Sequence, residues 1–250
     1  MAGPLTPGPP LVVEFVGLPG VGKSHATRLV AGRLAAAGVS ARSAALRVNH
    51  ELGPARRVAY KAGLSGAEIL RRPDRAVKAW RVLLRSSQQN RFDVVRLSYN
   101  WFFLVGLSRR ARSRRAVELL DEGIVQQLWS IGLAGGEQVV RDCSSNLLDG
   151  PVGASAVPDV VVVVEAPLEV IESRLAARGS RDSRLDRMAA AEQHAALVRG
   201  NALLGEILSH DLRLGAEASR PLVRRIRNGE PADLEADVDE LVDELTAIAA

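Results

Sequence analysis

The sequence predicts an α/β fold in which a mostly parallel sheet is covered by helices on both faces. Short apolar, β-branched runs alternate along the chain with segments of helical periodicity. The clearest run is 160–164, five consecutive valines after Pro158 and Asp159, as expected for a strand buried on both faces. A chain of 250 residues is long enough for one domain with a sizeable core, so we expect a single domain over 1–250.

Five strands and at least three helices account for the alternation. The strand-like runs cover 11–16, 42–48, 115–121, 160–165 and 222–227. The helical patterns cover 23–37, 137–148 and 234–249. The middle pattern of the three is the ambiguous one, and its apolar spacing favours a helix over a strand.

The region 52–112 has no strand pattern and is predicted to be a helical insertion over the mouth of the sheet. Its apolar residues recur at helical spacing in two segments, one with Ala76, Val77, Trp80, Leu83 and Leu84, the other with Leu97, Trp101, Leu104 and Val105. Pro73 precedes the first segment and is a good first-turn residue.

Composition limits the environment of the chain. No apolar run reaches the roughly 18–20 residues of a membrane span, so we expect no membrane partner. The segment 1–10 has neither a basic start nor an apolar core, and it is predicted to be a flexible lead-in rather than a targeting peptide. Cys143 is the one cysteine, which excludes an internal disulfide and a cysteine-based zinc site. The expected location is cytoplasmic.

Charge is distributed unevenly. Segment 54–115 has 16 basic and three acidic residues, a net of +13, whereas the whole chain has a net charge of +4. Such asymmetry is typical of a face for an acidic partner. It is equally compatible with solvated helix faces in an arginine-rich protein, since only three of the 33 basic residues are lysines.

The most informative motif is GLPGVGKS at 17–24, a complete G-x-x-x-x-G-K-[ST] phosphate loop between a predicted strand and a predicted helix. Its glycines let backbone N–H groups turn toward phosphates, and the helix presents its positive end. We therefore expect a nucleoside triphosphate, ATP, with Mg²⁺. The expected nucleotide contacts are Gly17, Leu18, Pro19, Gly20, Val21, Gly22, Lys23, Ser24 and the adjoining His25. Lys23 would reach the β- and γ-phosphates, and Ser24 would ligate Mg²⁺.

The motif and four further features resemble the thymidylate kinase and nucleoside kinase branch of the P-loop kinases. These features are LLDEG, PDVVVVVEAPLEVIESRL, RLAARGSRDSRLDR and a last strand running into a C-terminal helix. The resemblance covers most of the chain outside 52–112. It implies a P-loop NTPase fold of three α/β/α layers with sheet order 2-3-1-4-5. It also implies that 52–112 binds the acceptor and that 174–187 forms a lid.

Asp121 and Glu122 stand at the predicted C-terminal edge of the third strand, where open α/β sheets bind ligands. A carboxylate there can hold Mg²⁺, for which Asp121 is the candidate, or accept the proton of an attacking hydroxyl. The alternative role is a helix cap, because Gly123 and a helical pattern follow. The resembled kinases have Asp-Arg at this place, and Glu122 departs from that pattern. This departure disfavours a nucleoside monophosphate as acceptor.

A further carboxylate, Glu51, follows the second strand. In the resembled nucleoside kinases a Glu near this edge activates the acceptor hydroxyl, which makes Glu51 a parallel candidate for the base. A loop carboxylate in water is an equally good interpretation of Glu51.

Four arginines follow the fourth strand with helical spacing: Arg174, Arg178, Arg181 and Arg184. Guanidinium groups stabilise the charge of a phosphoryl group in transfer. We expect Arg174 to contact the nucleotide and Arg178 and Arg181 to contact the transferred group. Salt bridges to Asp182 and Asp186 on a solvated helix are the alternative.

The residues and the resemblance together predict an ATP- and Mg²⁺-dependent kinase that phosphorylates a hydroxyl of a small molecule, such as a nucleoside, a sugar or an aminocyclitol. Two alternatives stay open, a P-loop hydrolase or switch protein and a nucleic-acid end-processing kinase. The chain has no ABC-type signature and no guanine-reading N-K-x-D, which argues against the hydrolase or switch. It also has no recognisable nucleic-acid module, so a nucleic-acid partner is not expected. The oligomeric state is open, with a homodimer as one option.

Overall fold

The computed structural model describes residues 9–86, 91–114, 116–148, 155–178, 185, 188–209 and 221–249. Within them, five strands form one sheet in the order β2-β3-β1-β4-β5, and every neighbouring pair is parallel. The strands are β1 (Leu11–Val16), β2 (Ala41–Arg42), β3 (Val117–Leu120), β4 (Val160–Glu165) and β5 (Leu222–Arg227). The predicted α/β class and the strand order implied by the resemblance are therefore confirmed.

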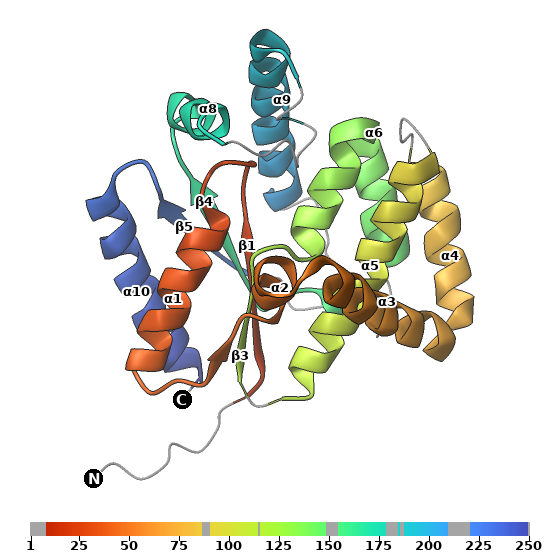
Figure 1. Cartoon of the computed structure of the whole chain (residues 1–250), viewed down its shortest axis with the longest axis horizontal. Coiled ribbons are helices and arrows are strands. Elements are labelled where there is room, and N and C mark those ends of the chain that lie inside the picture. The colour runs from red at the N-terminus through yellow and green to blue at the C-terminus, as the bar shows by residue number, and fades with distance from the viewer. Residues whose placement is uncertain are drawn as a thin grey trace.

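Helices cover both faces of the sheet and make three layers (Figure 1). On one face α1 (Lys23–Ala36) packs against α10 (Pro231–Ala249). On the other face lie α5 (Arg91–Arg112), α6 (Ile124–Leu147) and α9 (Ala190–Leu208), with α6 in contact with both of the others. All three helices expected outside the insertion are present, including the one whose pattern was ambiguous, which is the second half of α6.

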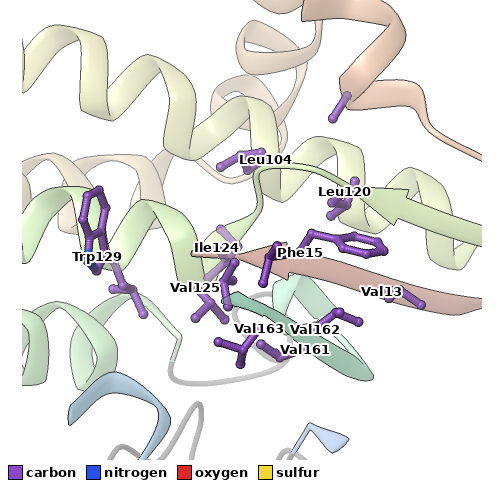
Figure 2. Close-up of a cluster of buried hydrophobic side chains, with 14 of the residues drawn as sticks. Val13, Phe15, Leu104, Leu120, Ile124, Val125, Trp129, Val161, Val162 and Val163 are labelled. Atoms are coloured by element: carbon purple, nitrogen blue, oxygen red, sulfur yellow. The ribbon is translucent and has the colours of Figure 1, made fainter. Parts of the chain in front are cut away.

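The core forms around the central strand, β1, and its neighbour β4 (Figure 2). Phe15 of β1 is fully buried and lies in register with Val162 of β4. Leu120 at the end of β3 and Ile124 at the start of α6 are also buried against this cluster. Because residues on both sides of 121–123 are fixed in the core, these three residues are held at the C-terminal edge of the sheet.

The insertion is helical, as predicted. It consists of α3 (Pro54–Arg71), α4 (Pro73–Leu84) and α5, and a proline begins each of the first two helices, where no N–H is needed. The apolar stripe predicted on α4 is divided, however. Leu83 is buried, whereas Trp80 and Leu84 are 52% and 58% exposed. The helical spacing is therefore confirmed, but only part of the apolar stripe of α4 packs against the rest of the molecule.

The strand expected at 42–48 is wrong for most of its length. β2 stops after two residues, and α2 (Ala44–Leu46) and the π-helical turn η1 (Arg47–Glu51) follow. The carboxylate of Glu118 in β3 accepts the backbone N–H of Ala44 at 2.7 Å, which stabilises the start of α2. A contact from a distant strand thus ends β2 early.

One more helix, α8 (Leu168–Ala176), follows β4 and lies near the loop that joins β1 to α1. None of the helices in the described ranges is long and apolar enough to cross a membrane.

Candidate active site

The loop of residues 17–22 joins β1 to α1 at the C-terminal edge of the sheet. Gly20 and Gly22 have φ of 87° and 96°, in the left-handed region that favours glycine. Space also requires glycine, because a Cβ on Gly22 would lie 2.1 Å from Nδ2 of Asn228. The two glycines therefore turn the backbone directly before α1.

The N-terminus of α1 is open toward this loop. No side chain caps it, and its first turn contains no acidic residue. The carbonyl of Gly22 accepts the N–H groups of His25 and Ala26, both at 3.0 Å, so the helix starts at the loop itself. The positive end of the helix dipole thus faces the loop, an arrangement that favours phosphate.

Lys23, the first residue of α1, extends back along the loop. Its Nζ donates to the carbonyl oxygens of Gly17 at 2.8 Å and Leu18 at 3.3 Å. Burial lowers the pKa of the Lys23 ammonium from 10.5 to about 8, and the carboxylates of Glu122 and Asp121 oppose that shift. The ammonium is therefore still protonated at neutral pH, although close to its pKa.

Asp121 and Glu122 directly follow β3, beside the loop. Asp121 is buried, and its Oδ2 accepts a hydrogen bond from the hydroxyl of Ser24 at 3.1 Å. Glu122 is exposed, and its charge acts on Lys23. A serine hydroxyl beside a carboxylate is an all-oxygen donor pair of the kind that Mg²⁺ prefers, with substrate phosphates and water completing the shell. These two oxygens fit the metal that the motif implies.

The insertion places a residue at this edge that no sequence motif indicates, Lys61 of α3. Its Nζ lies 4.9 Å from the centre of the Phe103 ring. Burial lowers the pKa of Lys61, and Glu122 is the main group opposing the shift. Lys23 and Lys61 therefore approach the same carboxylate from two elements. The sequence feature that distinguishes Lys61 is its residue type, since only three of the 33 basic residues are lysines.

Behind the loop, the start of α6 is tied to β1 through Glu14. This fully buried carboxylate accepts the N–H groups of Gln126 at 2.7 Å and Val125 at 3.1 Å. Gln126 in turn accepts the N–H of Gly17 through its side-chain oxygen at 3.1 Å. Burial raises the pKa of Glu14 to about 7. The sequence feature that could indicate this role is the presence of Glu14 as an acidic residue within the apolar run 11–16.

A second support reaches the loop from the other side. The Nδ2 of Asn228, which is buried just after β5, donates to the carbonyl of Val21 at 2.6 Å. The guanidinium of Arg174 donates to the same oxygen at 3.3 Å. The backbone N–H of Asn228 donates to the backbone carbonyl of Glu165 in β4 at 2.7 Å, so Asn228 itself is fixed to the sheet. No local sequence pattern indicates Asn228.

Two further residues predicted for the site have exposed side chains. Glu51 is exposed on η1 and pairs with Arg47 at 3.8 Å, and both side chains are more than half exposed. His25 is exposed on the first turn of α1. By contrast, the carboxylates whose charges act on Lys23 and Lys61 are those of Asp121 and Glu122.

The arginines expected in the lid are described only in part. Arg174 contacts the loop as given above, and Arg178 is exposed just after α8, where its charge acts on Lys23. Arg181 and Arg184, with most of the expected lid at 174–187, lie outside the described residues.

Comparison of the chain with models of protein families and with curated protein sequences gives no match. Among the residues that the structure describes, no group of three or more His, Cys, Asp or Glu side chains gathers as a metal site. The interpretation of the site therefore depends on its own geometry and chemistry.

Proposed function

We propose that the protein is an ATP- and Mg²⁺-dependent kinase of the P-loop class that phosphorylates a hydroxyl of a small molecule. The observation that carries the proposal is the contact between the 17–24 motif and Asp121. The motif runs from the end of β1 into the first turn of α1 and has left-handed glycines, and the hydroxyl of Ser24 donates to Asp121 at 3.1 Å. Donor phosphates, metal ligands and an acidic group thus share one edge of a parallel sheet.

In this proposal the loop N–H groups and the start of α1 hold the triphosphate, and Lys23 contacts its β- and γ-phosphates. The hydroxyl of Ser24 and the carboxylate of Asp121 would hold Mg²⁺, which offsets the negative charge of the phosphates. The hydrogen bond between Gln126 and Gly17 and the bonds to the Val21 carbonyl keep the loop in shape before the nucleotide arrives. Such preorganisation supports electrostatic catalysis.

The base is proposed to be Asp121 or Glu122, with Glu51 as the remaining candidate. A carboxylate accepts the proton of the acceptor hydroxyl while the oxygen attacks the γ-phosphorus. The bond to the β-phosphate oxygen then breaks, and ADP leaves. Glu122 suits this role because it is exposed to an incoming acceptor and its charge acts on both Lys23 and Lys61. Arg174 and Arg178 would stabilise the transferred group from the α8 side.

The acceptor is proposed to bind between α3 and the end of β3. Lys61 approaches that space from α3, and Arg57, one helical turn earlier, acts on Lys61 through its charge. Oxygen-rich acceptors such as nucleosides, sugars and aminocyclitols suit this combination of lysine, arginine and carboxylate.

A hydrolase is the second candidate, because an exposed Glu directly after a buried Asp at a strand end also suits the activation of water. Release of ADP from ATP with and without acceptors separates the two functions. We expect turnover to require an acceptor found by a thermal-shift screen of nucleosides, sugars and aminocyclitols in ADP–Mg²⁺. Turnover that no acceptor increases would favour the hydrolase, and failure to bind ADP–Mg²⁺ would contradict both.

A further inference from the structure

The outer side of α4 carries an apolar stripe. Helix geometry places Val77, Trp80 and Leu84 along one line, and their exposed fractions are 48%, 52% and 58% among the described residues. At the start of α5, which packs against α4, Phe92 and Val95 are 76% and 55% exposed. A tryptophan and a phenylalanine exposed to this extent on neighbouring helices mark an interaction surface rather than scattered surface residues.

Basic side chains line the side of this stripe that lies away from the buried face of α4. Helix geometry places Lys78, Arg81 and Arg85 beside it, and all three are exposed. The one acidic residue of α4 is Asp74, in its first turn. The helix belongs to segment 54–115, whose net charge is +13. Apolar and cationic groups thus occur together on one helix, at the rim of the molecule and on the far side of α5 and α6 from the strands (Figure 1).

We propose that this stripe binds the surface of a bilayer that contains anionic lipids. An amphipathic helix with Trp and Leu on one face and Lys and Arg beside them is the usual form of an interfacial membrane helix. Each nearby cation adds attraction to an anionic surface, and tryptophan prefers the interface. α4 has 12 residues, so it would lie in the plane of the interface and not cross it.

Charge argues against the other occupants of this face. A second copy of the chain would bring two surfaces of the same strong positive charge together, and such like-charge pairing is costly. Nucleic acid would satisfy the cations, but phosphate binding does not need a stripe of Val, Trp and Leu. The expectation of no membrane partner depended on the absence of a spanning segment, and surface binding needs none. The inference goes beyond the proposed kinase activity and does not depend on it.

The tryptophans of the chain provide a direct test. Of the three, Trp101 and Trp129 are buried at 3% and 5% exposure, so a change in quenching by iodide reports Trp80. With phosphatidylcholine vesicles containing roughly one third phosphatidylglycerol, we expect a blue shift of emission and protection from iodide. Pure phosphatidylcholine and high salt should each weaken both signals.

Substitutions complete the test through vesicle flotation. Leu84→Ser and Val77→Ser should each weaken partitioning about fivefold, and Lys78→Gln by a similar factor. Val198→Ser, at a matched exposed apolar position on α9 (45% exposed), should leave it unchanged. Absence of binding to the anionic vesicles overturns the proposal. So does protection of Trp80 by duplex DNA in place of vesicles, or by raising the protein concentration alone, which would indicate nucleic acid or a second copy.

Discussion

At the scale of single residues, the candidate site depends on two lysines that converge on one pair of carboxylates. Lys23 approaches Asp121 and Glu122 from the start of α1, and Lys61 approaches them from α3. An ammonium is a compact point charge that changes its pKa readily on burial, unlike a guanidinium. In a chain whose other basic residues are nearly all arginines, lysine at these two positions suits a site where charge must be concentrated.

Replacing Lys23 by Ala should weaken triphosphate binding while leaving the fold intact, because the side chain donates to loop carbonyls and does not pack in the core. Without the charge-assisted hydrogen bonds from this ammonium, binding of ATP–Mg²⁺ should be weaker by roughly 10- to 100-fold. Calorimetry measures the affinity and circular dichroism the fold. Lys78→Ala, on the exposed face of α4, is the matched control and should bind as the wild type does. Wild-type affinity in the Lys23 variant would mean that the loop has another role.

Asp121→Asn and Glu122→Gln should differ in kind. A variant without a Mg²⁺ ligand should regain activity when Mg²⁺ is raised, which we expect for Asp121 because of its hydrogen bond with Ser24. A variant without the base should show a kcat about 10²–10⁴ lower that Mg²⁺ does not restore, which we expect for Glu122. Steady-state ADP release over a Mg²⁺ series measures both. Near-full activity in both variants would contradict both assignments and point to Glu51.

Glu14 should make stability depend on pH. Burial raises its pKa to about 7 in the folded state, while the unfolded value stays near 4.5. Between these values the folded state holds a proton that the unfolded state has released, so stability decreases as pH rises from 4.5 to 7. The decrease amounts to about 3 kcal/mol. Urea unfolding of wild type and Glu14→Gln at several pH values tests this. The amide does not titrate, so the difference between the two proteins should change across that window, and a constant difference would contradict the assignment.

At the scale of elements, the sequence pattern predicted an element correctly where both of its faces have the same surroundings or where only nearby residues contact it. The valine run became β4 because both its faces are covered by helices, as its composition indicates. The run at 42–48 failed because Glu118, more than 70 residues away, accepts the Ala44 N–H and starts a helix. Periodicity also identified an apolar face on α4, but periodicity does not tell what covers a face, and Trp80 is half exposed.

The end of β5 should matter for nucleotide binding although it contributes no residue to the motif. Asn228→Ala removes the 2.6 Å hydrogen bond to Val21 and leaves a void where the side chain packs against Gly22. Removing a buried hydrogen bond costs about 1–3 kcal/mol of stability. We expect a lower Tm and a several-fold weaker affinity for ADP–Mg²⁺. Asn146→Ala, which removes an exposed amide-to-carbonyl bond of 2.8 Å on α6, is the control, and equal behaviour of the two variants would show that the Asn228 bond does not position the loop.

At the scale of the whole molecule, the insertion and α8 lie on different sides of the loop and should respond to different ligands. Hydrogen exchange should slow first at 17–28 and around Arg174 and Arg178 when ADP–Mg²⁺ is added, since these segments would surround the phosphates in the proposed complex. Protection over 52–112 should require the acceptor as well. Full protection of 52–112 by nucleotide alone would contradict the assignment of the acceptor to this region.

The strand order and the helical insertion could be predicted, whereas the inner supports of the site could not. The glycines and Lys23 of the motif are recognisable because phosphate binding fixes their spacing in sequence. Gln126, Asn228 and Lys61 approach the loop or its carboxylates from α6, β5 and α3. Such interactions are set by how the elements pack, so no local pattern encodes them. The residues proposed to contact the nucleotide are therefore recognisable in the sequence, whereas those that hold them or face them are not.

The central place of β1 has a consequence for how the chain folds. Among the described strands β1 comes first along the chain, yet its partners are β3 and β4, and the second of these ends only at Glu165. Strand pairs so distant in sequence are slow to form, because a long loop must close before they stabilise anything. During synthesis the apolar run of β1 therefore stays without its full set of sheet partners until β4 has emerged as well. In that interval the run is exposed apolar surface, which is the kind of segment that aggregates unless it is shielded.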